Sequence, residues 1–169
     1  MTETTLPALD AMDTKILQAL QSDGRLSNAA VAQLANTSTA TCHRKIQRLF
    51  KEGFITAVRA LVAPRKVGLG TLIFLGVVLD RSTPESFASF EAAIRRLPMI
   101  IDCHVVAGDF DYFIKIRANG IDDFNRLHAE TLLHLPGVRQ TRTFFVLKEV
   151  VDNMKLDFPR QQAVSQPSR

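Results

Sequence analysis

Apolar side chains recur at helical spacing in the first third of the chain. Residues 11–22 form the first predicted helix, because its apolar positions share one face: Met12, Ile16, Leu17 and Leu20. Asp10 stands where a helix N-cap belongs, and Asp13 adds negative charge to the first turn. Ser27 is expected to cap a short second helix over residues 28–34. Its buried side chains are predicted to be Val31 and Leu34.

Residues 39–51 predict a third, strongly amphipathic helix. At roughly 100° per residue, one face carries the apolar side chains Cys42, Ile46, Leu49 and Phe50. The opposite face carries Thr41, Arg44, Arg48 and Lys51. Ser38 is the expected N-cap, and Gly53 stands where a left-handed residue ends a helix. Helix, short helix, tight turn over residues 35–38 and basic helix together describe a helix-turn-helix.

After residue 53 the pattern changes from helical to alternating. Residues 54–62 alternate well enough to predict a strand, which is either the wing of the helix-turn-helix or a hinge. Pro64 and the glycines at 68 and 70 suggest a boundary between domains.

The second half reads as strand, helix, strand, strand, helix, strand. The predicted strands cover residues 71–79, 99–106, 110–117 and 138–151, and the predicted helices cover 84–97 and 121–135. Along the third strand, Phe110, Tyr112, Ile114 and Ile116 are expected on one side. Asp111, Lys115 and Arg117 are expected on the other. This order predicts a ferredoxin-like βαββαβ domain in an α+β protein, with both helices on one face of an antiparallel sheet. The uncovered face predicts a homodimer.

Charge is concentrated around the third helix. The chain has 169 residues and a net charge of +4. Residues 38–66 contain seven basic side chains and one acidic one, Glu52, whereas the rest of the chain from residue 67 is balanced. A local basic patch of this kind is typical of nucleic-acid binding, so the expected partner is double-stranded DNA.

Several classes of protein are excluded by the composition. No apolar run reaches the roughly 18 residues of a membrane span, and residues 1–7 lack the basic and apolar regions of a signal peptide, so we expect a cytoplasmic protein without a membrane partner. Cys42 and Cys103 fall in a helical and a strand pattern, which suggests no disulfide. No Cys/His cluster has zinc spacing, and we expect neither a metal nor a cofactor.

The third helix supplies the candidate DNA contacts. Its N-terminal half, the part of a helix-turn-helix that meets base edges, carries Thr39, Ala40, Thr41 and Arg44. Arg44 could bond a guanine through two hydrogen bonds. Lys45, Arg48 and Lys51 are expected to contact phosphates. Ser38 and His43 complete the predicted DNA site.

Motifs spread over residues 9–158 resemble the leucine-responsive regulatory protein family, Lrp/AsnC. In the first half they are Leu9-Asp10, Asp13, Ile16-Leu17, Leu20, Asp23-Gly-Arg-Leu-Ser27, Cys42, Arg48-Leu49 and Gly53-Phe-Ile55. In the second half they are Cys103-His-Val-Val-Ala-Gly-Asp-Phe-Asp-Tyr112, Glu130-Thr-Leu-Leu133, Leu135-Pro-Gly-Val138, Thr141-Arg-Thr143 and Lys148-Glu-Val150. The resemblance implies a winged helix-turn-helix, a ligand-sensing domain, dimers that often assemble to octamers, and small amino acids as effectors.

The sequence pattern and this resemblance together divide the chain into four parts, the last of them defined by its Gln/Ser/Pro-rich composition. Residues 9–53 would be the DNA-binding domain, 54–66 the wing or hinge with a linker, 67–158 the ligand-sensing and oligomerisation domain, and 159–169 a disordered tail. The sequence departs from the family at the start of the third helix. Ser38-Thr-Ala-Thr41 replaces the usual Ser-Pro-Thr-Pro, so the side chains that face DNA differ.

The resemblance also implies an effector site. Gly108, Asp109 and Asp111 form the turn and strand at which the family binds effectors, and Asp111 could pair with the ammonium of a free amino acid. An apolar side chain of the effector would be held by Val105, Ile121, Phe144, Phe145 and Val146. The expected effector is a small or branched apolar amino acid, leucine first, bound between dimers that form a tetramer of dimers.

Three alternatives remain open. His104, Asp109 and Asp111 could be catalytic or metal-binding groups, although nothing in the sequence positions a nucleophile, a phosphate loop or a redox motif. A sensing module that acts on an enzyme is the second alternative, and the basic helix-turn-helix argues against it. The third is a DNA-architectural protein that needs no effector.

Overall fold

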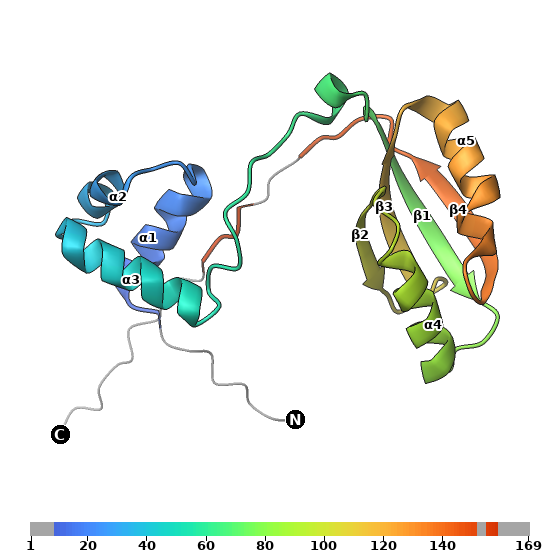
Figure 1. Cartoon of the computed structure of the whole chain (residues 1–169), viewed down its shortest axis with the longest axis horizontal. Coiled ribbons are helices and arrows are strands. Elements are labelled where there is room, and N and C mark those ends of the chain that lie inside the picture. Colours follow the sequence, from blue (N-terminus) through green and yellow to red (C-terminus); the bar gives the residue numbers. More distant parts are fainter. Residues whose placement is uncertain (1–8, 152–154, 159–169) are drawn as a thin grey trace. The chain divides into compact units, whose positions relative to one another are not determined.

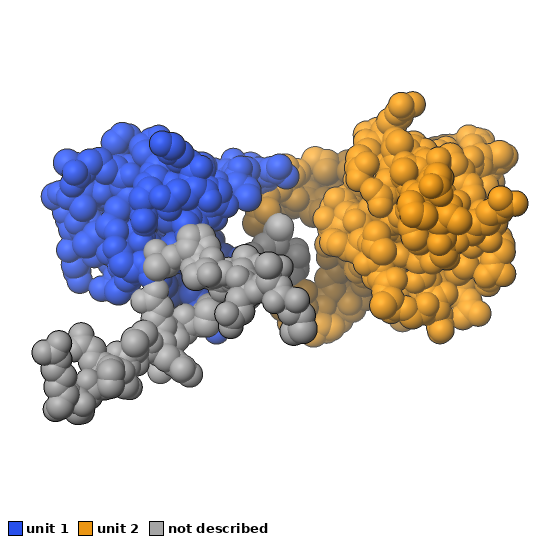
Figure 2. Space-filling view, turned by 90° about the horizontal axis from the view of Figure 1, so that it is seen from below, with its two compact units in different colours: residues 1–60, 152–169 blue, residues 61–151 orange. Residues whose placement is uncertain are grey.

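The computed structural model describes residues 9–151 and 155–158. The tail predicted to be disordered, residues 159–169, lies outside the described residues. The chain divides into two compact units (Figure 2), of which the first contains residues 9–60 and 155–158 and the second contains residues 61–151. Each unit has a hydrophobic core of its own.

The first unit consists of the three predicted helices, α1 (Ala11–Ser22), α2 (Asn28–Leu34) and α3 (Thr39–Lys51) (Figure 1). All three predicted N-caps are confirmed. The side chains of Asp10, Ser27 and Ser38 each accept a hydrogen bond from the backbone N–H three residues later. Gly53 has φ 78°, the left-handed conformation that ends a helix.

The core of the first unit lies where the three helices meet. Its members include Ile16 and Leu17 of α1, Val31 of α2, and Cys42, Ile46 and Leu49 of α3. Two side chains that were predicted to be buried are exposed instead, Leu34 by 59% and Phe50 by 40%. Phe50 is exposed because its position around the helix axis puts it at the edge of the apolar stripe of α3. At the end of α2, the buried residue is Ala35 rather than Leu34.

The strand predicted over residues 54–62 does not form, so this prediction is wrong. Phe54 and Ile55 pack against the core of the first unit, and the backbone from there to residue 63 adopts no regular structure. Val58, Leu61 and Val62 are exposed. Alternation alone does not make a strand, because an extended segment also needs a neighbouring strand to satisfy its backbone, and none pairs with it in the described part of the chain. A short 3₁₀ turn, Pro64–Val67, follows.

The second unit confirms the ferredoxin-like order. The strands are β1 (Thr71–Leu79), β2 (Ile100–Val105), β3 (Tyr112–Ala118) and β4 (Val138–Phe145), and they form one antiparallel sheet in the order β2-β3-β1-β4. The helices α4 (Pro84–Ile94) and α5 (Gly120–Glu130) connect them (Figure 1). The helix predicted over 121–135 is interrupted at Thr131, after which Leu132–His134 form a 3₁₀ turn.

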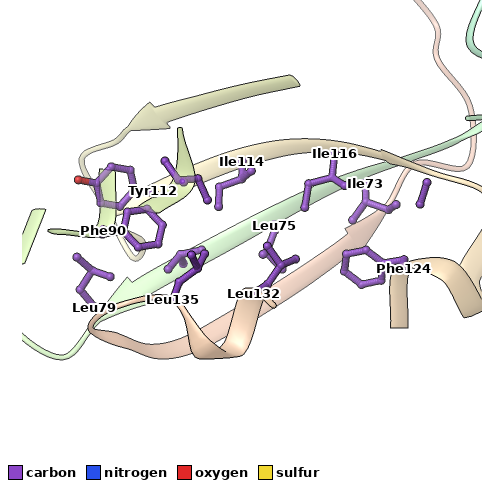
Figure 3. Packing of buried hydrophobic residues seen from close by; sticks show 13 residues of the cluster. Ile73, Leu75, Leu79, Phe90, Tyr112, Ile114, Ile116, Phe124, Leu132 and Leu135 are labelled. Carbon is purple, nitrogen blue, oxygen red and sulfur yellow. The ribbon is translucent and has the colours of Figure 1, made fainter. Parts of the chain in front are cut away.

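The core of the second unit lies between one face of the sheet and the two helices (Figure 3). Alternate residues of β1 and β3, among them Ile73, Leu75, Ile114 and Ile116, point towards Phe90 of α4 and Phe124 of α5. Tyr112 packs here as well, with its ring 4.6 Å from that of Phe90. Burial of the phenol and its hydrogen bond to Glu91 raise the pKa of Tyr112.

Two details of the predicted sheet are wrong. The last strand ends at Phe145, not at residue 151. Phe110 lies on the face opposite to Tyr112, because residues 107–111 form a turn before β3 begins and the alternation predicted through them does not hold. The ring of Phe110 covers Gly76 of β1, where a Cβ would lie 2.7 Å from the nearest ring carbon.

We call the second face of the sheet the open face. It carries alternate residues of all four strands together with Phe110: Leu72, Phe74, Gly76, Asp102, His104, Phe113, Lys115, Arg117, Arg142 and Phe144. The rings of Phe110, Phe113 and Phe144 pack together at centroid distances of 5.2–6.3 Å. Phe144 is nevertheless 45% exposed and Phe74 37% exposed. The open face is therefore an apolar surface with charged residues beside it.

Candidate functional site

The exposed side of α3 carries one continuous stripe of polar and basic residues. Opposite the buried face, the exposed residues at helical spacing are Ala40, Arg44, Gln47 and Lys51. The described ion pairs of the helix involve Lys45 and Arg48 instead of Arg44 or Lys51. Arg44 and Lys51 therefore present their charges outward, where an anionic ligand can reach them.

The predicted DNA residues at the start of α3 have two different roles. Ser38 accepts from the Thr41 backbone N–H at 3.2 Å, and its hydroxyl lies 2.9 Å from the Thr41 hydroxyl, so both side chains are used in capping the helix. Thr39 and Ala40 are exposed. His43 is exposed too, and its Nδ1 lies 3.0 Å from the amide nitrogen of Asn28 on α2. This contact ties the two helices of the motif together.

Lys45 and Arg48 turn away from the exposed stripe and meet the start of α1. Lys45 Nζ lies 2.9 Å from Asp13 Oδ1 and 2.5 Å from Asp10 Oδ2, and an Arg48 guanidinium nitrogen lies 2.5 Å from Asp13 Oδ2. Asp13 is only 1% exposed. A buried carboxylate is stable only when it is paired, and here two cations from α3 pair with it.

Asp13 is also part of the cap of α1. Its carboxylate accepts from the Asp10 backbone N–H at 3.0 Å, and the Asp10 carboxylate accepts from the Asp13 N–H at 2.7 Å, which is a reciprocal capping box. Burial by itself would raise the pKa of Asp13. The hydrogen bonds from Asp10, Lys45 and Arg48 outweigh it and lower that pKa to about 2. The charged form of Asp13 is therefore strongly stabilised.

The predicted effector residues Gly108, Asp109 and Asp111 lie in the turn between β2 and β3. Gly108 has φ 138°, a conformation that favours glycine, and Asp109 is exposed. Asp111 is half-buried, and its Oδ2 accepts from the Leu79 N–H at 2.8 Å. Its Oδ1 lies 3.5 Å from the Ser82 hydroxyl. Asp111 thus fixes the end of β1 to the start of β3 and has one oxygen with only a long contact.

Most of the other predicted effector residues do not gather around Asp111 within one chain. Ile121 and Val146 lie at the end of the sheet where β3 stops and β1 starts, about 20 Å along β3 from its first residue. Phe144 lies on the open face, whereas Phe145 lies on the helix face and packs on Phe124 at 5.4 Å. A pocket made from all of these residues would need more than one chain.

Val105 lies at a cavity that none of the other predicted effector residues lines. It is 63% exposed at the end of β2 and lines a cavity of about 210 Å³ with Glu91, Arg95, Cys103 and Tyr112. Burial raises the pKa of the Cys103 thiol to about 11, so this cysteine stays protonated at neutral pH. Val105 nevertheless lies beside the predicted effector turn, because it pairs with Tyr112 in the sheet and the next residue, Val106, donates its backbone N–H to the Asp111 carbonyl at 3.0 Å.

Among residues 9–151 and 155–158, no three His, Cys, Asp or Glu side chains are grouped as metal ligands would be. No helix in the described part of the chain combines the length and apolar character that crossing a bilayer requires.

Each of the two units matches a known protein domain. Residues 9–49 match the AsnC-type helix-turn-helix domain, and residues 72–156 match the Lrp/AsnC ligand binding domain. The leucine-responsive regulatory protein of Salmonella typhimurium is 40% identical over 148 residues, which are 88% of this chain and 90% of the relative. The chain belongs to the Lrp/AsnC family. It is accordingly a DNA-binding transcriptional regulator and not an enzyme.

Solved structures with the same fold are found among transcriptional regulators. A transcriptional regulator of Neisseria meningitidis, solved in complex with L-methionine, is 31% identical with a TM-score of 0.85, and the match covers 89% of this chain and 97% of that one. Escherichia coli AsnC has the same fold, with 24% identity and a TM-score of 0.79 over 86% of this chain and 97% of that one.

Two features of this Lrp/AsnC regulator were not predicted from its sequence: the place of Gln47 on the exposed stripe and the partners of Asp13 on α3. Gln47 lies between Arg44 and Lys51 on the exposed stripe, and its spacing from them, three and four residues, could have shown this. Asp13 was recognised as an acidic residue of the first turn, but its pairing with α3 was not. That pairing joins residues 32 and 35 positions apart, and no local pattern reports such a contact.

Proposed function

We propose that this regulator binds double-stranded DNA with α3 in the major groove and changes its assembly or DNA affinity when an amino acid binds. The observation that carries the proposal is the exposed stripe of α3. An arginine, an amide and a lysine point outward from a helix whose opposite face is fully buried. This chemistry suits base edges flanked by phosphates.

The stripe assigns a role to each side chain. Arg44 can donate two hydrogen bonds to guanine, and the Gln47 amide can bond adenine through its donor and acceptor. Thr39 and Ala40 are exposed near the helix start and can contact a thymine methyl group. Lys51, in the last turn, contacts a phosphate and sets the position of the helix without reading sequence. Ser38 and Thr41 contribute indirectly, by capping the helix.

For assembly we propose a homodimer formed through the open face of the sheet. The support is a contiguous aromatic cluster of Phe110, Phe113 and Phe144 that remains partly exposed in the single chain. Apolar patches of this kind mark association surfaces. Dimers then associate into a tetramer of dimers. Light scattering on the full chain should give at least a dimer at micromolar concentration, and a monomer would contradict the proposal.

For the effector we propose a small apolar amino acid, leucine first, at the turn that contains Gly108, Asp109 and Asp111. The support is Asp111 Oδ1, which accepts only a long hydrogen bond of 3.5 Å from the Ser82 hydroxyl and can also accept from an ammonium group. The apolar side of the site is supplied by a second chain, since Ile121 and Val146 of the same chain lie at the other end of the sheet. The similar Neisseria protein binds L-methionine, so methionine is the second ligand to test.

Two observations favour a second candidate, a DNA-architectural regulator that needs no effector. The Asp111 carboxylate already accepts from Leu79, and the effector residues are dispersed within one chain. A single experiment separates the two. Calorimetry with leucine, methionine, alanine and phenylalanine on the full chain detects binding, and an electrophoretic shift assay repeated with the bound amino acid detects coupling to DNA. Heat from none of the four would favour the architectural function.

A further inference from the structure

The ion pairs between α1 and α3 neutralise part of the positive charge of α3, the helix proposed to bind DNA. Of the four basic side chains of α3, Lys45 and Arg48 end on the carboxylates of Asp10 and Asp13. Arg44 and Lys51 lie on the exposed stripe. These two cations and two carboxylates sum to zero charge, and Arg48 also lies 3.8 Å from Glu52, so only half of the basic charge of α3 faces outward.

This arrangement follows from the positions of the residues on α3. Lys45 and Arg48 are three positions apart and share the flank of the helix that faces α1. Asp13 is fixed by the capping box and is buried, so it has no freedom to leave its partners. The Lys45 side chain is only 20% exposed, whereas that of Arg48 is 39% exposed. The cations are therefore held by an anion that cannot move away.

The pairing should control how DNA is bound. Each lysine or arginine that neutralises a phosphate releases counterions and adds about 0.9 to the slope of log affinity against log salt. A cation that is already neutralised by Asp13 has no charge to offer and adds nothing to this slope. It can, however, hold the recognition helix at a fixed angle to α1.

We propose that Asp13 is a positioning residue for DNA recognition, which fixes α3 through Lys45 and Arg48 and keeps both cations from the phosphates. Non-specific binding depends on phosphate contacts, so the pairing lowers it while the reading side chains Arg44 and Gln47 stay in place. This inference rests on the DNA binding proposed above and adds to it a way in which the chain limits non-specific binding.

The test is a salt titration of DNA binding by fluorescence anisotropy, with the full chain and with random and selected duplexes. Lys51→Gln is the matched control, because it also removes one lysine charge from α3, but from the exposed stripe. We expect Lys51→Gln to reduce the slope by about 0.9 per bound protomer and Lys45→Gln to leave it unchanged. Asp13→Asn removes the buried carboxylate, leaves Lys45 with Asp10 and Arg48 with Glu52 at 3.8 Å, and should steepen the slope by about 0.9 per protomer.

The specificity of DNA binding is a second measurement, and a purely structural role of Asp13 would not change it in this way. Asp13→Asn should bind random DNA at least tenfold more tightly at low salt, and the ratio of selected to random affinity should fall. Lys45→Arg preserves the pair and should behave like the wild type. Circular dichroism establishes that each variant is folded. If Asp13→Asn does not fold, Lys45→Gln and Arg48→Gln still decide, since both are expected to leave the slope unchanged.

The outcomes separate the two proposals. A wild-type chain that fails to bind any duplex at low salt contradicts the DNA function itself. A wild-type chain that binds, with a slope that falls by about 0.9 in Lys45→Gln, shows that Lys45 already contacts a phosphate and overturns the inference about Asp13. A folded Asp13→Asn with unchanged slope and specificity overturns it as well.

Discussion

Arg44 and Lys51 carry the same charge on the same exposed stripe, yet we predict different consequences of removing them. Arg44→Ala should weaken binding to the selected operator by about 1–3 kcal/mol and relax specificity at one base pair, because a bidentate contact to guanine is lost. Lys51→Ala should weaken binding to all sequences alike, because a phosphate contact carries no sequence information. Binding to a library of operator variants distinguishes the two. An Arg44→Ala protein with unchanged selectivity would show that the reading residue lies elsewhere.

Asp13 makes the stability of the first unit depend on pH. Its pKa is lowered from an ordinary 3.8 to about 2, so folding favours the ionised form. The resulting stability, about 2 kcal/mol, is complete above pH 4–5 and is lost as the pH falls through about 2. Hydrogen exchange of the amides of α1 and α3 between pH 5 and pH 2, corrected for intrinsic rates, measures it. Asp13→Asn should show lower protection at pH 5 and a flatter dependence. An equal pH dependence in that variant would assign the effect to other carboxylates.

Among the elements, the helices and the four strands of the sheet carry clear local patterns and agree with the sequence, whereas details that depend on a distant partner do not. The three helices of the first unit were predicted with their caps, because Asp10, Ser27 and Ser38 act on backbone groups three residues away. The strand expected over residues 54–62 does not form, since a strand also needs a neighbour. The sequence also did not show that Ile121 and Asp111 lie at opposite ends of β3, because this separation follows from strand direction and register.

Gly76 shows how one position of β1 determines the shape of the open face. A methyl group there would lie 2.7 Å from a ring carbon of Phe110, so Gly76→Ala should displace the ring and destabilise the second unit by about 1–3 kcal/mol. The chain has a single tyrosine, Tyr112, and no tryptophan, so tyrosine fluorescence during urea unfolding reports this unit alone. Phe110→Ala in the same chain removes the clash. The double variant should therefore be less destabilised than the sum of the single variants, and simple additivity would contradict the proposed contact.

At the scale of the whole molecule, an amino acid can regulate DNA binding only if it has different affinities for different assembly states. We expect leucine or a related apolar amino acid to change the dimer–octamer balance or the DNA affinity by a coupling energy of about 1–3 kcal/mol. Asp111 offers a matched pair of variants. Asp111→Asn keeps an oxygen that can accept from the Leu79 N–H but loses the charge, whereas Asp111→Ala loses both.

If the carboxylate binds the effector's ammonium, both variants should lose the response to leucine, and Asp111→Asn should retain wild-type stability and DNA affinity without effector. DNA binding persists because α3 belongs to the other unit. If Asp111 serves only to join β1 to β3, Asp111→Asn should respond to leucine like the wild type and only Asp111→Ala should be impaired. Calorimetry with leucine and light scattering with and without leucine, on both variants, decide between these outcomes. Equal leucine affinity in Asp111→Asn and wild type would place the ammonium site on another residue.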